Sequence, residues 1–232
     1  MSIGNSLAKG LTKQIGRSHQ DTRKASLDHT INQLSKPEAS KSRKIWFRNI
    51  NKLIRQLFGD ALIESSSMGT GKQAKSTYIG LFWPTFDDPN DPYCFLALGY
   101  VDARSFDYEV RPYPIMLSKH GIQRLIQSAD TKDLGELSAF IRPHIMAMME
   151  CFEEGGYDGH NVLIYCDNGV SIWVVGPTED HAGIIMATLK TFIRADSLEG
   201  FHARNYQRID QTNNDYYHTS YPIKETSDES RH

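Results

Sequence analysis

The sequence predicts an α+β fold: a basic helical N-terminal arm, then a mainly antiparallel sheet of about six strands with two helices inserted between its halves. Strand-like segments come in two runs separated by helix-like segments, rather than alternating with helices one by one, which is typical of this class. Charge is equally uneven. The first sixty residues carry twelve Lys/Arg and four Asp/Glu, hence +8, whereas the remaining 172 carry −10.

Three regions follow from composition and periodicity. Residues 1–44 form a basic, partly disordered helical arm and linker, 45–210 a single α+β domain, and 211–232 a polar C-terminal tail. Within the arm, apolar residues recur every four positions from Ile3 to Ile15, with lysines and an arginine between them, and this spacing predicts a narrow apolar stripe on a basic helix. A second helix is expected over 21–34.

Residues 45–63 predict a stronger helix, because apolar residues from Trp46 to Phe58 follow the spacing of three and four. Its basic residues lie largely off that stripe. The next segment, "SSSMGTGKQAKST" (65–77), resembles a phosphate-binding loop only in part, since Lys72 is followed by Gln73 rather than Ser or Thr. We therefore expect a flexible Gly/Ser loop there.

The first run of strands comprises 76–83, 93–101 and 106–117. The third strand contains Pro112 and Pro114, which cannot donate backbone hydrogen bonds. Its first half is therefore expected to be irregular or to lie at an edge.

Two helices come next. Ser118 can cap a helix that runs to Ser128, and a longer apolar helix follows up to the glycine pair at 155–156. Pro143 lies inside the longer helix and predicts a kink or a break near Ile141.

The second run of strands is centred on "DNG" (167–169), a hairpin signal between the apolar segments 161–166 and 170–176. Residues 183–194 are strand-like by their β-branched content, although their length also allows a helix. A short helix is expected within 197–210.

Composition limits the possible classes of function. The three cysteines show no CxxC or CxxH spacing and lie in apolar segments, which predicts buried, reduced thiols. No run approaches the roughly 20 apolar residues of a membrane span, and no secretory leader opens the chain, so we expect a cytoplasmic protein without a transmembrane segment. The histidines lack ligand spacing, and we expect neither a metal site nor a cofactor.

The basic arm and the helix after it predict attraction to RNA or another polyanion. A protein partner, peripheral membrane contact by residues 3–17, and a merely solvated extension are the alternatives. The residues expected to contact nucleic acid are all basic: Lys41, Arg43, Lys44, Arg48, Lys52, Arg55 and Lys119.

One pair of residues has side chains of the types that act in catalysis. His120 and Arg124 share a face if 118–128 is helical. A histidine of near-neutral pKa can act as a general base, and an arginine one turn away can stabilise phosphate charge, as a metal-free ribonuclease requires. The same spacing also occurs in surface and capping pairs, so both interpretations remain.

The segment "LSKHGIQRLIQS" resembles the opening helix of RelE-like, BrnT-type toxin ribonucleases, on Ser118, His120 and Arg124. Further along, "ATLKTFIRAD" is similar to a late strand of that family, with Thr191 and Arg194 in the corresponding places. The resemblance covers about residues 117–196. It implies a catalytic face made of His120, Arg124, Thr191 and Arg194.

Two functions are therefore predicted. The first is nucleic-acid binding, with metal-independent endoribonuclease activity at a His/Arg face. The alternative is a non-catalytic intracellular interaction or regulatory module that docks through its basic N-terminal arm.

Overall fold

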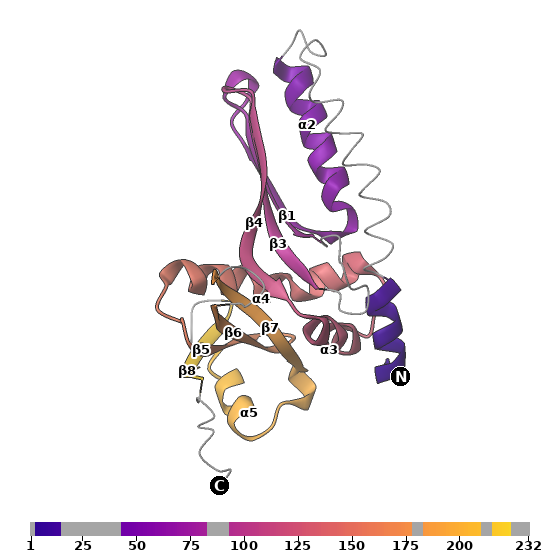
Figure 1. Cartoon of the computed structure of the whole chain (residues 1–232), viewed down its shortest axis with the longest axis vertical. Coiled ribbons are helices and arrows are strands. Elements are labelled where there is room, and N and C mark those ends of the chain that lie inside the picture. The colour runs from indigo at the N-terminus through magenta and orange to yellow at the C-terminus, as the bar shows by residue number, and fades with distance from the viewer. Residues whose placement is uncertain (1–2, 15–42, 83–92, 178–182, 210–214, 224–232) are drawn as a thin grey trace. The chain divides into compact units, whose positions relative to one another are not determined.

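The structure is a computed structural model that describes residues 3–14, 43–82, 93–177, 183–209 and 215–223. The chain divides into two compact units, Met1–Arg142 and Pro143–His232 (Figure 1). The fold is α+β, as predicted. The described residues contain eight strands rather than about six, four of them in each unit.

The first unit contains an antiparallel meander of four strands, in which each strand pairs with the next one along the chain. They are β1 (Leu62–Met68), β2 (Lys75–Phe82), β3 (Cys94–Asp102) and β4 (Asp107–Leu117). The three strands predicted between residues 76 and 117 are thus confirmed.

Helix α2 (Arg43–Phe58) packs along one face of this meander (Figure 1). Its residues Ile50, Ile54 and Phe58 are buried against β2 and β3, as the apolar spacing predicted. The strands leave room for the helix at glycines: a Cβ at Gly99 would lie only 3.0 Å from Ile54 Cγ2. Helix and sheet therefore approach more closely than larger strand residues would allow.

Strand β1 corrects the prediction of a flexible loop over 65–77. The segment forms a hairpin in which β1 pairs with β2 across the short 3₁₀ turn Gly71–Gln73. Hydroxyl groups link the two strands, with Ser66 Oγ 2.7 Å from Thr77 Oγ1 and Ser67 Oγ 2.8 Å from Ser76 Oγ. Serine has little strand preference of its own, so these cross-strand pairs and not propensity explain the strand.

The prolines of β4 accompany an irregularity in its pairing, but it lies in the second half of the strand, whereas the first half, 107–112, pairs regularly with β3. Ala97 pairs with Pro112, whereas Phe95 pairs with Met116, so the register shifts across the proline segment. Proline lacks a backbone N–H, and the extra residues of the bulge accommodate that missing donor.

The helices between the two runs of strands also form. Helix α3 (Lys119–Ala129) begins as predicted, with the Gly121 N–H donating to Ser118 Oγ over 3.1 Å. Helix α4 (Leu134–Glu154) contains Pro143 but is not broken near Ile141. Pro143 has no N–H to donate to the carbonyl of Ala139, one turn earlier. Ala139 is exposed, so water can donate to that carbonyl instead.

The second unit has the strand order β7-β6-β5-β8, with every neighbouring pair antiparallel. The predicted hairpin is confirmed as β5 (His160–Cys166) and β6 (Gly169–Pro177), and the predicted run 183–194 is a strand, β7 (Ile185–Arg194). The short helix predicted near the end is α5 (Gly200–Tyr206), preceded by the 3₁₀ turn Ala195–Ser197.

Strand β8 (Tyr217–Pro222) lies within the region predicted to be a polar tail. It pairs with β5, for example Tyr217 with Tyr165 and Thr219 with Leu163. Its alternating Tyr and Thr residues favour a strand, but the segment has too few aliphatic residues to resemble one by hydrophobicity.

The N-terminal stripe is only partly exposed. Residues 5–14 are helical, and Ala8, Leu11 and Thr12 are buried, whereas Leu7 is exposed. The second helix predicted in the arm lies outside the described residues, as does most of the linker. Among the described helices, none combines the length and the apolar character needed to span a membrane.

Candidate nucleic-acid interface

One side of α2 carries a row of basic residues. Lys44, Arg48 and Lys52 recur every four positions, and Arg55 follows three residues later. This spacing places the Cα atoms of all four on the same side of the helix, over about 16 Å of its axis. All four side chains are exposed, and α2 contains no acidic residue. We call these four residues the basic row.

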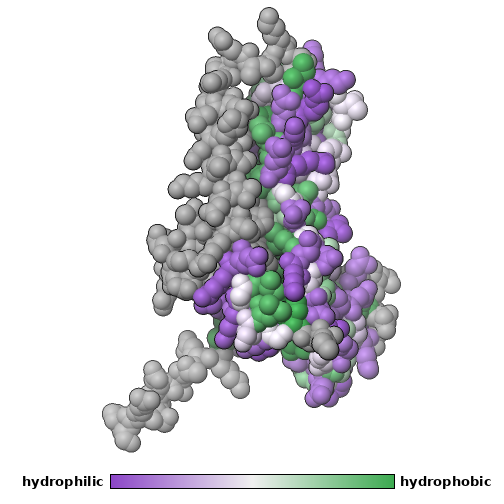
Figure 2. Space-filling view, turned by 90° about the vertical axis from the view of Figure 1, so that its right-hand side faces the viewer, coloured by the Kyte–Doolittle hydropathy of each residue, from purple (hydrophilic) through white to green (hydrophobic). Residues whose placement is uncertain are grey.

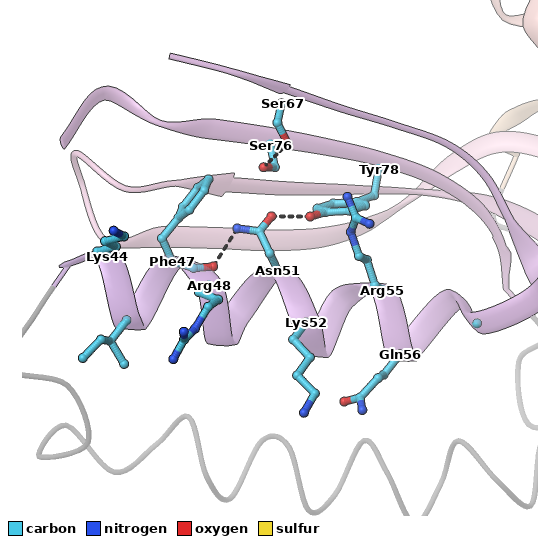
Figure 3. Close-up of a pocket in the computed structure, with 12 residues that line it drawn as sticks. Lys44, Phe47, Arg48, Asn51, Lys52, Arg55, Gln56, Ser67, Ser76 and Tyr78 are labelled. Carbon is cyan, nitrogen blue, oxygen red and sulfur yellow. Dashed lines mark hydrogen bonds between the residues drawn. The ribbon is translucent and has the colours of Figure 1, made fainter. Parts of the chain in front are cut away.

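The basic row borders an open groove of about 1010 Å³ on the surface of the first unit. The groove is formed by α2 together with β1 and β2 (Figure 3). Its described lining contains four basic residues and no acidic one: Lys44, Ile45, Phe47, Arg48, Asn51, Lys52, Arg55, Gln56, Gly59, Ser67, Ser76 and Tyr78. An anionic ligand in this groove would meet positive charge and neutral polar groups, together with the apolar side chains of Ile45 and Phe47.

Side chains within the groove hold one another in place. The Tyr78 hydroxyl donates to Asn51 Oδ1, and Asn51 Nδ2 donates to the Phe47 carbonyl over 2.6 Å. Arg55 lies over the Tyr78 ring, with its guanidinium carbon 5.8 Å from the ring centre. Figure 3 shows Asn51 and Arg55 directed toward the strands and Lys52 directed away from them. The groove therefore combines an ordered floor with cations at its border.

One face of the molecule is mainly polar where the structure describes it, and the basic row has no acidic partner there. On the face shown in Figure 2, hydrophilic residues cover most of the surface that the structure describes, with smaller hydrophobic areas between them. Among the described residues, no carboxylate forms a salt bridge with Lys44, Arg48 or Lys52. Their charges are therefore not neutralised by neighbouring acids of the described chain.

The remaining basic residues expected to contact nucleic acid lie elsewhere. Arg43 does not line the groove; its guanidinium carbon lies 4.7 Å from the centre of the Phe106 ring. Lys119 is partly exposed at the start of α3, and Lys41 lies outside the described residues.

The predicted catalytic pair lies on the exposed side of α3. His120 and Arg124 are both exposed, one turn apart, and the Arg124 guanidinium donates to Gln127 Oε1 over 3.3 Å. The capped N-terminus of the helix is close by, because Ser118 is the N-cap. Both side chains are therefore accessible to a substrate.

The other two predicted catalytic residues belong to the second unit. Thr191 is partly buried on β7, and Arg194 ends that strand in a 2.9 Å ion pair with Asp196. The four residues are thus distributed as two pairs, one in each unit.

A polar network around His144 was not predicted. His144 is fully buried on α4, with Nε2 2.7 Å from Asn168 Oδ1 and Nδ1 2.9 Å from Ser171 Oγ. Because a carbonyl oxygen only accepts, Nε2 carries the proton and Nδ1 accepts from the Ser171 hydroxyl. That hydroxyl in turn accepts from Trp173 Nε1–H over 2.7 Å.

Burial lowers the pKa of His144 from its ordinary 6.5 to about 4, against the opposing effect of hydrogen bonds with Asn168 and the Ile164 backbone. The imidazole is therefore neutral at neutral pH. The sequence held one signal of this role, since His144 occupies an apolar position of α4, three residues after Ile141.

The three cysteines are buried, reduced thiols, as predicted. Burial raises the pKa of the Cys151 and Cys166 thiols to about 12, so neither is a thiolate at neutral pH. Within the described ranges, no three His, Cys, Asp or Glu side chains are grouped closely enough to hold a metal ion.

Comparison with known proteins finds no protein-family model that matches the chain, and no significant match among the curated proteins or the solved structures.

Proposed function

We propose that this protein binds nucleic acid, with RNA the expected ligand, through the groove bordered by the basic row of α2. The observation that carries the proposal is the lining of that groove, which has four basic residues, no acidic residue among those described, and polar or aromatic side chains between them. Phosphate groups provide most of the affinity in nonspecific nucleic-acid binding, and rows of Lys and Arg are the usual contacts.

The test is fluorescence anisotropy of a short labelled single-stranded RNA, titrated at several salt concentrations. For the wild-type protein, the logarithm of the binding constant should fall linearly with the logarithm of the salt concentration. The variant Arg48→Ala/Lys52→Ala should bind more weakly, and its slope should be smaller by about 0.7 for each phosphate that the variant no longer neutralises. Alanine favours a helix, so α2 should persist.

The matched control is Arg111→Ala/Lys132→Ala, which removes the same charge from exposed positions of the first unit outside the groove. It should retain the wild-type slope. Equal weakening in the two double variants would mean that net charge, and not the groove, determines binding. Absence of salt-sensitive binding by the wild-type protein would contradict the proposal and favour an interaction module that docks on a protein.

A second candidate function is metal-independent cleavage of the bound RNA. The observation that favours it is the exposure of His120 and Arg124, one turn apart beside the capped N-terminus of α3. In this proposal His120 takes the proton of the ribose 2′-hydroxyl, and Arg124 stabilises charge on the phosphate. The resemblance to toxin ribonucleases also implies roles for Thr191 and Arg194, which belong to the second unit.

Cleavage is tested by incubating total RNA with the protein in EDTA. Wild-type protein should cleave, whereas His120→Ala should not. Because His120 is exposed, its replacement should leave the fold intact. Cleavage by both proteins would point to a contaminating nuclease, and cleavage by neither would leave binding as the function of the groove.

A further inference from the structure

The turn between β3 and β4 carries an aromatic residue in an unfavourable backbone conformation. Phe106 has φ of +58° and is 43% exposed. Left-handed backbone in such turns is normally supplied by Gly or Asn, because a large side chain is disfavoured there. Neither backbone preference nor core burial explains a phenylalanine at this position.

The ring of Phe106 is held in place by α2. Trp46 meets it edge-on, with the ring centres 5.3 Å apart, and the Arg43 guanidinium carbon lies 4.7 Å from its centre. A guanidinium over an aromatic ring is a favourable contact and fixes the ring plane. Arg43 directly precedes Lys44, the first residue of the basic row, so the ring lies at the end of α2 where that row begins.

Two more exposed side chains with apolar surface follow the turn along β4. Tyr108 pairs with Val101 and Val110 with Gly99, on the face of the meander that α2 covers. Nevertheless, Tyr108 remains 40% and Val110 37% exposed. Phe106 in the turn and Tyr108 in the first half of β4 therefore present exposed rings near the end of α2 that carries Arg43.

We infer that Phe106 and Tyr108 form a stacking platform for unpaired bases, and that the protein prefers single-stranded to double-stranded nucleic acid. The inference rests on the proposed function. Single-strand binders combine cations that follow the backbone with aromatic rings on which bases stack. A duplex offers the same phosphates, but its bases are already stacked on each other. The protein can therefore bind a duplex through its cations but not through its aromatic rings.

The experiment compares one labelled RNA without internal pairing as a single strand and as a duplex with its complement. The wild-type protein should bind the single strand more tightly. Phe106→Gly removes the ring and suits the positive φ, so it should not destabilise the turn. It should weaken single-strand binding about tenfold and leave duplex binding unchanged. Tyr108→Thr, which keeps strand propensity, should act in the same direction.

Phe201→Ala is the matched control, since Phe201 is an exposed aromatic residue of the second unit. It should bind both forms as the wild type does. Equal binding of single strand and duplex by the wild-type protein would overturn the inference, as would a Phe106→Gly variant that keeps the single-strand preference. If Arg48→Ala/Lys52→Ala still weakens binding in that case, the proposed function stands and only the platform is wrong. If the wild-type protein binds neither form, the proposed function itself fails.

Discussion

At the scale of single residues, the buried histidine of α4 links stability to pH. His144 is neutral in the folded protein, where its pKa is about 4, whereas in the unfolded chain its pKa returns toward 6.5. The unfolded state therefore binds a proton more readily, and stability is lost as pH falls from 6.5 toward 4. Each pH unit between the two pKa values corresponds to about 1.4 kcal/mol. Acidification across this range therefore lowers the free energy of unfolding by about 3 kcal/mol through His144 alone.

Urea unfolding at a series of pH values measures this effect. His144→Gln should be less stable than the wild type near neutral pH, because it disturbs the hydrogen bonds with Asn168 and Ser171. It should, however, lose less stability on acidification, because the titrating group is gone. His120→Gln, at an exposed histidine, should keep the wild-type dependence. Identical acid sensitivity in His144→Gln and the wild type would contradict this assignment.

At the scale of elements, the packing of α2 on the first meander depends on close approach at glycines. A Cβ at Gly80 would collide with the Phe58 ring, which is completely buried. Gly80→Ala should therefore force α2 away from β2 and reduce the free energy of unfolding by about 1–3 kcal/mol. Thermal unfolding measures the effect.

The control is another strand glycine. A Cβ at Gly176 of β6 would meet only Asp158 Oδ1 at 3.9 Å, which is ordinary contact. Gly176→Ala should be close to neutral. If the two alanine variants unfold at the same temperature, close packing of α2 on β2 is not a major source of stability.

The elements that could be predicted from the sequence are those with a local signal. Ser118 marks the start of α3, and "DNG" marks the turn between β5 and β6. Strands β1 and β8 were not predicted, because the serines of β1 have little strand preference and β8 has too few aliphatic residues to resemble a strand by hydrophobicity. The groove beside the basic row could be predicted only in part for the same reason. The basic row follows from spacing alone, but its groove needs Ser67 of β1, in a segment expected to be a loop.

At the scale of the whole molecule, charge is separated along the chain. The formal net charge is −2 and the sequence pI is about 6.5, although the first sixty residues carry +8. At about pH 8 the protein as a whole is negative, yet lysine and arginine side chains keep their positive charge. Net charge therefore predicts no attraction to polyanions, whereas the local arrangement of the basic row predicts it.

Heparin chromatography at about pH 8 separates these two expectations, because heparin is a polyanion without bases and reports only on charge. The wild-type protein should be retained despite its negative net charge and should elute with salt. Arg48→Ala/Lys52→Ala should elute at lower salt, and Phe106→Gly should elute with the wild type because stacking plays no part. If the wild-type protein is not retained on the column, the acidic residues of the remaining chain offset the attraction between heparin and the basic row. Equal retention of the double variant would place the attracting charge in basic residues other than Arg48 and Lys52.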